Sequence, residues 1–317
     1  MAEPLVTILI PCYNAERFIA ETLDSALAQT WPRVEIVVVN NGSTDRSPEI
    51  LKEYERRGVR VVSKENEGAS AARNLAFRES QGEFIQYLDA DDLLAQDKIE
   101  LQMRRLLSAP AESVSACAWA RFYDSPADAR FVREPVWADM DAIGWLVTAW
   151  TGGWMMASHA WLTPRSVIER AGGWDEMPSP NDDGEFFARV LLNSAGVVFC
   201  EEARVFYRSG MQGSTSKSRS DVMLTAIYLS IEQSTRLLLE REDSPRTRRA
   251  AAAYFQRFVY DTYPDAPGLV RQAEERVRAL GGSDLQLSTG GSLHRLAVRT
   301  LNWKRAKRIQ RLYRKLR

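Results

Sequence analysis

The chain has 317 residues, of which 45% are hydrophobic and 26% are charged, a composition that suits one large α/β domain with an appendage. Its formal net charge is zero, and three cysteines, Cys12, Cys117 and Cys200, lack both the even count of a disulfide framework and the close spacing of a zinc site. These features exclude a small disulfide-stabilised protein, and we expect a reducing, cytoplasmic location.

Apolar runs and helical patterns alternate through the first third of the chain. The patterns predict strands at residues 6–11, 35–39, 59–63 and 84–88, and helices at residues 15–28, 47–56 and 69–80. Successive β-α units of these lengths are typical of a mainly parallel sheet flanked by helices. No basic n-region precedes the first strand, so we expect no signal peptide.

The pattern becomes less regular after a predicted helix at residues 97–107 and a strand at residues 114–122. Residues 142–164 contain no Asp, Glu, Lys or Arg, but their glycines and four dispersed tryptophans favour a buried helix and an aromatic-lined pocket over a membrane span. Gly and Pro punctuate residues 171–180. Beyond them we expect a helix at 184–194, short strands at 197–199 and 205–207, and helices at 221–240 and 246–263.

Polar residues follow three of the predicted strands. Asp89, Asp91 and Asp92 come directly after the fourth strand, and the first two strands end in a turn and in a loop of small polar residues. In open α/β sheets ligands bind beyond the carboxyl ends of the strands, and an acidic rim there suits a diphosphate with a divalent ion. The alternative is that these acids only start a helix, where the macrodipole favours them.

Five motifs resemble, in order, those of the family 2 glycosyltransferases: IPCYNAE, VVVNNGSTD, NEGASAARN, YLDADDLL and NDDGEFFARVLL. The resemblance implies the GT-A fold over residues 1–220, an α/β architecture with a Rossmann-like nucleotide-sugar-binding half at 1–110 and an acceptor half at 111–220. We expect a helical extension at 221–280, then a flexible linker and a basic amphipathic tail at 281–317. The implied reaction is an inverting, metal-dependent transfer from a nucleotide sugar.

The resemblance implies roles for the acid cluster. Asp89 is expected to meet the ribose or a metal-bound water, and Asp91 is expected to ligate Mn²⁺ or Mg²⁺, with Asp89 as a second metal contact. The ion neutralises the charge of the diphosphate leaving group. Asp92 is expected to cap the next helix.

A base-binding pocket is expected across the first two strand ends. Tyr13 offers a stacking surface, while Arg73 offers donors to a phosphate or the base unless it is only a surface residue of its helix. Relatives usually carry acidic residues at the positions of Asn40 and Asn41, where a carboxylate accepts the N3–H of uracil. An asparagine oxygen can also accept that bond, and a UDP-sugar is the expected donor. The expected nucleotide-binding residues are Pro11, Tyr13, Asn14, Asn40, Asn41, Arg73, Asp89 and Arg208.

The motif NDDGEFFARVLL is expected to carry the catalytic base. An inverting transfer needs a carboxylate that takes the proton from the acceptor hydroxyl. By the resemblance Asp183 is this base, Asp182 orients it or raises its pKa by like-charge repulsion, and Glu185 is the reserve candidate. The alternative is a set of ordinary acids at a helix N-terminus.

Two residues of the tryptophan-rich stretch are candidate acceptor contacts. Trp154 is a possible sugar-stacking platform and His159 a possible hydrogen-bond partner, although core packing accounts for either residue as well. Arg208 leads into a loop of small residues that we expect to fold over the diphosphate, the alternative being a plain connector.

We expect the sugar to be moved to a hydroxyl of a glycan or of a lipid-linked saccharide. A polyprenyl-phosphate sugar synthase of the same fold and a catalytically inert, membrane-docked binding module are the alternatives. A sugar-nucleotide pyrophosphorylase is disfavoured, because IPCYNAE lacks the glycines of a triphosphate-binding loop.

The last segment of the chain is strongly basic. Ten Lys or Arg and no acid fall within residues 295–317, whereas residues 1–294 carry 32 basic and 42 acidic groups. Apolar residues at 301, 309, 312, 313 and 316 can share one side of a helix, which predicts an in-plane helix on an anionic membrane surface, at the inner face of the plasma membrane. The alternative is a solvated tail that binds a protein or RNA, although we expect no nucleic-acid partner.

Overall fold

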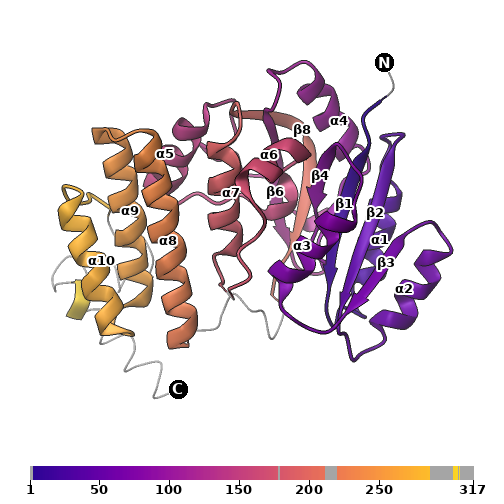
Figure 1. Cartoon of the computed structure of the whole chain (residues 1–317), viewed down its shortest axis with the longest axis horizontal. Coiled ribbons are helices and arrows are strands. Elements are labelled where there is room, and N and C mark those ends of the chain that lie inside the picture. Colours follow the sequence, from indigo (N-terminus) through magenta and orange to yellow (C-terminus); the bar gives the residue numbers. More distant parts are fainter. Residues whose placement is uncertain (1–2, 178, 211–219, 286–302, 306, 308–317) are drawn as a thin grey trace.

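The computed structural model describes residues 3–177, 179–210, 220–285, 303–305 and 307. The sheet built from the N-terminal strands lies at one end of the molecule, and three long helices, α8 to α10, lie at the other end (Figure 1). Between these ends lie a second sheet and helices α5 to α7.

A five-stranded sheet with the order β3-β2-β1-β4-β7 forms the first half. The central strand β1 (Val6–Cys12) runs parallel to β2 (Val34–Asn41) and to β4 (Phe84–Tyr87). Strand β3 (Arg60–Lys64) extends the parallel order, and the short β7 (Thr163–Pro164) pairs antiparallel with β4. The apolar run of β1 is almost wholly buried, as expected for a strand covered on both faces. The predicted fold class, a mainly parallel α/β sheet flanked by helices, is confirmed.

Three helices connect these strands: α1 (Ile19–Leu27), α2 (Ser47–Glu55) and α3 (Ala69–Glu79). Helix α1 begins four residues later than predicted. The backbone N–H groups of Ala15 and Glu16 donate to the side chains of Ser47 and Asp45, so the loop after β2 holds this turn outside the helix.

The second sheet has the order β5-β8-β6. It contains β5 (Leu93–Leu94), β6 (Val114–Phe122) and β8 (Val197–Arg208), with α4 (Lys98–Leu107) between β5 and β6 in the chain. The prediction of two short strands in place of β8 was wrong. One continuous strand carries a bulge, because Cys117 pairs with Cys200 while the next residue, Ala118, pairs with Arg204.

The tryptophan-rich stretch forms α5 (Ala142–Gly152), an irregular segment and the 3-10 turn η2 (Ser158–Ala160). Trp145 and Trp161 are buried with ring centroids 5.1 Å apart, which confirms the predicted buried helix. In the part of the chain that the structure describes, no helix combines the length and apolarity needed to cross a bilayer.

Helix α6 (Arg165–Ala171), which was not predicted, leads through a loop to α7 (Asp182–Leu192). Helix α7 begins two residues earlier than predicted. Both Asp182 and Asp183 therefore belong to its first turn.

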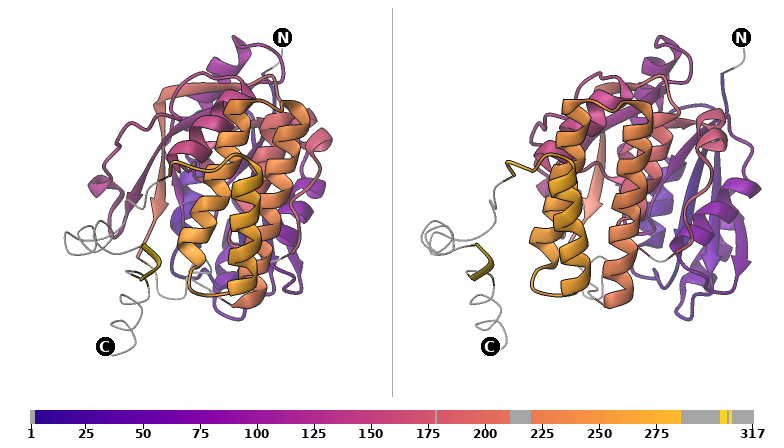
Figure 2. Two further views of the ribbon diagram at one scale, coloured as in Figure 1. Left: turned by 90° about the vertical axis from the view of Figure 1, so that its left-hand side faces the viewer. Right: turned by 60° about the vertical axis from the view of Figure 1, so that its left-hand side comes forward.

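The C-terminal region is helical, as expected, with α8 (Asp221–Arg241), α9 (Pro245–Thr262) and an unpredicted α10 (Pro267–Ala279). Figure 2 shows these helices side by side. They share a small apolar cluster of their own, while α8 packs on α7 and α9 packs on α5. The domain boundary at residue 220 stays a prediction.

Candidate active site

Hydrogen bonds tie the carboxyl ends of β1 and β2 together. Asn14 donates from its backbone N–H to Ser43 Oγ (3.1 Å), and its Oδ1 accepts from the Thr44 N–H (2.8 Å). Asn14 has a φ of +48°, a left-handed conformation that asparagine tolerates better than most residues. Tyr13, next to Asn14, is 50% exposed, and Pro11 is partly buried at the end of β1. The ring of Tyr13 is thus open to a stacking partner.

The two asparagines that end β2 bond to the surrounding loops. Asn40 Oδ1 accepts from the Ser43 N–H (3.1 Å). The Asn41 amide donates to Asn66 Oδ1 and to Gly68 O, each at 3.1 Å, and accepts from the Glu67 N–H. Asn41 therefore holds the turn before α3, and its NH₂ group has a structural use that a carboxylate could not fulfil. The contact of either residue with uracil stays a prediction.

The acidic turn after β4 divides into two environments. Asp92 is buried, accepts from the Arg208 N–H (2.7 Å) and faces His159 Nδ1 at 3.2 Å. Burial and the neighbouring acids Asp91 and Asp89 raise the pKa of Asp92, while burial lowers the pKa of His159 to about 4. Both shifts disfavour the charged forms of this buried pair.

Two expectations are corrected by this pair. Asp92 does not cap the next helix, because the N-cap of α4 is Asp97 and Asp92 is enclosed by β8 and η2. His159 has no exposed surface and cannot contact an acceptor, so the core alternative holds. Trp154, in contrast, is 39% exposed after α5, and its role as a sugar platform stays a prediction.

Arg208 lies behind the acidic turn. Its Nε donates to Asp91 O (2.8 Å), and its Nη2 pairs with Glu21 Oε2 (2.5 Å). The guanidinium lies over the rings of Phe18 and Phe122 at 4.7 and 4.4 Å. Through these contacts Arg208 supports the backbone at Asp91. The expected contact of Arg208 with a diphosphate stays a prediction.

Asp89 and Asp91 remain partly exposed on the open side of the turn. Burial and the charge of Asp89 raise the pKa of Asp91 to about 6. A cation beside this pair would relieve that repulsion, so the two carboxylates fit a divalent ion. Among the described residues, no group of three or more His, Cys, Asp or Glu is arranged to hold a metal. An ion at this turn would need further oxygen ligands from a diphosphate and water, which is how Mg²⁺ usually binds.

Arg73 joins the acidic turn to the start of α7. Its Nη2 pairs with Asp89 Oδ1 (2.7 Å) and its Nη1 pairs with Asp182 Oδ2 (2.8 Å). Arg73 is only 7% exposed, and its guanidinium lies 4.4 Å from the ring of Trp174. Although burial opposes the charge, the carboxylates raise its pKa above the ordinary value. The alternative of a surface helix residue is wrong.

Trp174 was missed in the sequence, where it fell within a stretch interpreted as Gly and Pro punctuation. Its ring stacks on Phe186 with centroids 4.1 Å apart, and Asn74 bonds to its backbone N–H and carbonyl. The sequence signal that could have identified this residue was a single tryptophan shortly before the acids of α7. Trp174 thereby positions the guanidinium of Arg73 between the two acidic groups.

Asp183 occupies the first turn of α7, next to Asp182. Its backbone N–H donates to Asp182 Oδ1 (2.9 Å), and its Oδ1 accepts from the Gly184 N–H (2.7 Å). Burial and the charge of Asp182 raise the pKa of Asp183 to about 7. A carboxylate with a pKa near neutrality is suited to accept a proton from a substrate.

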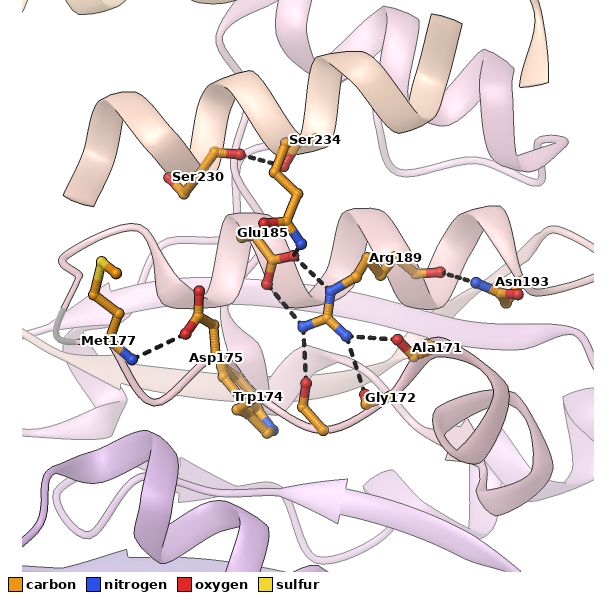
Figure 3. Close-up of polar contacts among 12 residues, drawn as sticks. Ala171, Gly172, Trp174, Asp175, Met177, Glu185, Arg189, Asn193, Ser230 and Ser234 are labelled. Atoms are coloured by element: carbon orange, nitrogen blue, oxygen red, sulfur yellow. Dashed lines mark hydrogen bonds and ion pairs between the residues drawn. The ribbon is translucent and has the colours of Figure 1, made fainter. Parts of the chain in front are cut away.

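Glu185 faces Arg189, which lies one turn further along α7 (Figure 3). It is 2% exposed and forms a bidentate pair with Arg189, with Nε–Oε1 at 2.5 Å and Nη2–Oε2 at 2.8 Å. Arg189 also donates to the carbonyls of residues 171–173. This ion pair anchors the loop before Trp174 and opposes the reserve-base role, which stays a prediction.

The helical extension holds the first turn of α7 in place. Asn181 Nδ2 donates to Ser230 Oγ on α8 (2.8 Å) and to the Tyr254 hydroxyl on α9 (3.0 Å), and Gln233 on α8 donates to Glu185 (3.1 Å). No local sequence pattern indicated these contacts. Residues 221–280 are therefore part of the support for the acids of α7.

Comparisons with known proteins bear on the family and the fold. Residues 7–170 match the family described as Glycosyl transferase family 2. "Glycosyltransferase GlyA" of Streptococcus pneumoniae is 37% identical over 114 residues, which cover 35% of this chain and 16% of that protein. The chain spans 16 to 44% of the length of the first curated relatives that it matches.

Two solved structures share the fold. S. aureus TarS 1–349 in complex with UDP-GlcNAc has a TM-score of 0.62 at 17% identity, covering 87% of this chain and 89% of that one. The mannosyltransferase PcManGT of Pyrobaculum calidifontis, in complex with GDP-Man and Mn²⁺, has a TM-score of 0.54 at 18% identity, covering 99% and 89%. The architecture is thus of the GT-A type. Since residues 7–170 make up more than half of the 317 residues, the chain belongs to glycosyl transferase family 2.

Proposed function

We propose that the protein transfers a sugar, with inversion, from a nucleoside-diphosphate sugar to a hydroxyl of a glycan or a lipid-linked saccharide. One observation carries this proposal. A buried guanidinium, Arg73, links the acidic turn at Asp89 to the acids of α7, at Asp182. A carboxylate for the donor side and a carboxylate for proton removal thereby belong to one connected site.

In the proposed reaction the carboxylates have separate tasks. The oxygen of the acceptor hydroxyl attacks the anomeric carbon while Asp183 accepts the proton of that hydroxyl. The bond from the anomeric carbon to the diphosphate breaks on the opposite face of the sugar. The Asp183 pKa of about 7 makes this residue a base at neutral pH, and the bonds to Asp182 and Gly184 orient it. Arg73 holds the Asp182 carboxylate in place through their ion pair.

Asp91 and Asp89 would hold Mn²⁺ or Mg²⁺, which supplies charge neutralisation for the departing diphosphate. Tyr13, Pro11 and Asn14 would form the wall of the base pocket. Two related folds carry UDP-GlcNAc or GDP-Man in their structures, so both uridine and guanosine donors require testing, with a UDP-sugar as our proposal.

A donor screen tests the proposal. The purified protein is incubated with UDP-, GDP-, dTDP- and CMP-sugars and Mn²⁺, and nucleotide binding and nucleoside-diphosphate release are both measured. We expect one nucleotide to bind with metal dependence and to be released as the diphosphate. Asp91→Ala should lose metal-dependent binding, whereas Asp183→Asn should bind and not turn over. Metal-dependent binding without turnover of any donor would favour the inert binding module.

We propose in addition that the basic tail docks the protein on an anionic membrane surface, next to a lipid-linked acceptor. Most of residues 292–317 lie outside the described part of the chain. Within it, Trp303 contacts the rings of Tyr260 and Tyr263 at 4.8 and 5.4 Å, and Lys304 pairs with Glu274 (2.5 Å). These contacts tie Trp303 and Lys304 to the extension. Each Lys or Arg of the tail near an anionic lipid surface would add to membrane binding.

A further inference from the structure

A cavity of about 430 Å³ lies between α8 and the loop before α7, with one residue from α10. Its volume falls within the range of about 300–1,000 Å³ that is usual for small-molecule sites. Figure 3 shows four residues of its lining, Asp175 and Met177 on the loop, Glu185 on α7 and Ser230 on α8. Asp182 also lines the cavity, so it opens beside the residue that precedes the proposed base.

The walls of this cavity are held firmly. Ser230 accepts a hydrogen bond from Asn181, the residue before Asp182, and Gln233 donates to the buried Glu185. Glu185 is in turn fixed by Arg189. A ligand in the cavity would therefore meet a surface that is rigidly connected to the first turn of α7, where the acceptor hydroxyl must be placed.

The charges in the cavity disfavour an anionic ligand. Four carboxylates line it, from Asp175, Asp182, Glu185 and Glu232, against two guanidinium groups. Each guanidinium already has a carboxylate partner, since Arg236 pairs with Glu240 (2.6 Å) and Arg276 with Glu232 (3.6 Å). Three of the carboxylates are paired as well, Asp182 with Arg73, Glu185 with Arg189 and Glu232 with Arg276. A phosphate group would therefore meet no unpaired guanidinium among the described residues of the lining.

The cavity also has an apolar side. Met177 and Leu229 are 50% and 42% exposed on its two walls, which is high for large apolar side chains. A sugar ring offers hydroxyl groups at its edge and C–H groups on its faces. Carboxylate and serine oxygens beside exposed methionine and leucine side chains match both kinds of surface.

We infer that this cavity is an acceptor subsite, which binds a neutral saccharide unit adjoining the reacting hydroxyl. The inference rests on the proposed transferase function and deepens it by naming the acceptor class. The extension, through α8, then selects the acceptor, while the α/β part binds the donor. A polyprenyl phosphate does not suit this subsite.

Filling the cavity tests the inference. Leu229→Trp places a bulky ring in it from α8, and Met177→Trp does so from the opposite wall. Val222→Trp, at an exposed position of α8 outside the cavity, is the matched control. Binding of neutral oligosaccharides, acidic oligosaccharides and farnesyl phosphate is measured by saturation-transfer NMR with UDP and Mn²⁺ present, and then titrated for each variant. Melting temperature and nucleotide binding establish that each variant is folded.

We expect at least one neutral oligosaccharide to bind the wild type, and both cavity variants to weaken it by about tenfold or more, while the control changes it by less than about twofold. The inference is overturned if no neutral oligosaccharide binds, if the cavity variants bind it normally, or if only an anionic probe competes for the cavity. Saccharide binding that the cavity variants abolish, in a protein that binds no nucleotide, would uphold the subsite and refute the transferase.

Discussion

Replacing Asp183 by asparagine should remove activity and raise stability together. In the folded chain its pKa is about 7, against an ordinary value of 3.8, because of burial and the charge of Asp182. Between these two pH values the folded state binds more protons than the unfolded state, so this residue makes the wild type less stable as pH rises through that window. An asparagine carries no charge at any pH and escapes this penalty.

The size of the effect follows from the pKa difference. The change from 3.8 to about 7 is worth roughly 4 kcal/mol at most, at about 1.4 kcal/mol for each pKa unit. Solvent reaches this partly exposed side chain and screens its charge, so we expect a gain of about 2 kcal/mol for Asp183→Asn at pH 8 and much less at pH 5. Transfer should fall by about 10²–10⁴-fold, the usual effect of losing a general base.

Urea unfolding of the wild type and of Asp183→Asn at pH 5 and pH 8 measures the stability difference, and the donor assay measures turnover. Asp124→Asn, at an exposed position, serves as the control for removing a surface carboxylate. A stability difference that is the same at both pH values would refute the raised pKa. Near-normal turnover would refute the assignment of the base.

Three other changes test the surroundings of the site. Arg73→Met leaves two carboxylates without their buried cation and should lower the free energy of unfolding by about 3–5 kcal/mol, whereas losing the exposed pair in Arg57→Met should cost much less; equal losses in urea unfolding would contradict the bridging role. Asn40→Asp keeps its acceptor oxygen and should strengthen UDP binding in calorimetry, while Asn41→Asp loses two donated bonds and should weaken it; the opposite order would refute the loop role of Asn41. Deleting residues 292–317 should release the protein from anionic vesicles in a flotation assay and leave turnover on a soluble acceptor analogue unchanged, and continued vesicle binding would exclude the tail as the anchor.

Much of the α/β part could be predicted from the sequence, because its signals are local. The apolar runs of β1, β2 and β4 and the helical spacing between them depend only on neighbours in the chain. Parallel strands of such units end at one edge, so the positions of Tyr13, Asn40 and Asp89 near that edge followed from the order of the elements. The prediction of two short strands in place of β8 was wrong because a bulge interrupts the regular pairing within this single strand.

The roles of individual side chains depended on contacts between distant segments, which only the tertiary structure provides. Arg73 pairs with Asp182, 109 residues away, and this pairing made it a buried bridge rather than a surface cation. His159 was excluded from the acceptor site by its burial against Asp92. Ser230 and Tyr254, which lie in the extension, accept hydrogen bonds from Asn181, and no sequence motif indicated these contacts. Hydrophobic periodicity specifies which face of an element is buried, but the partner that it meets, and therefore the charge and pKa at the site, is decided by packing.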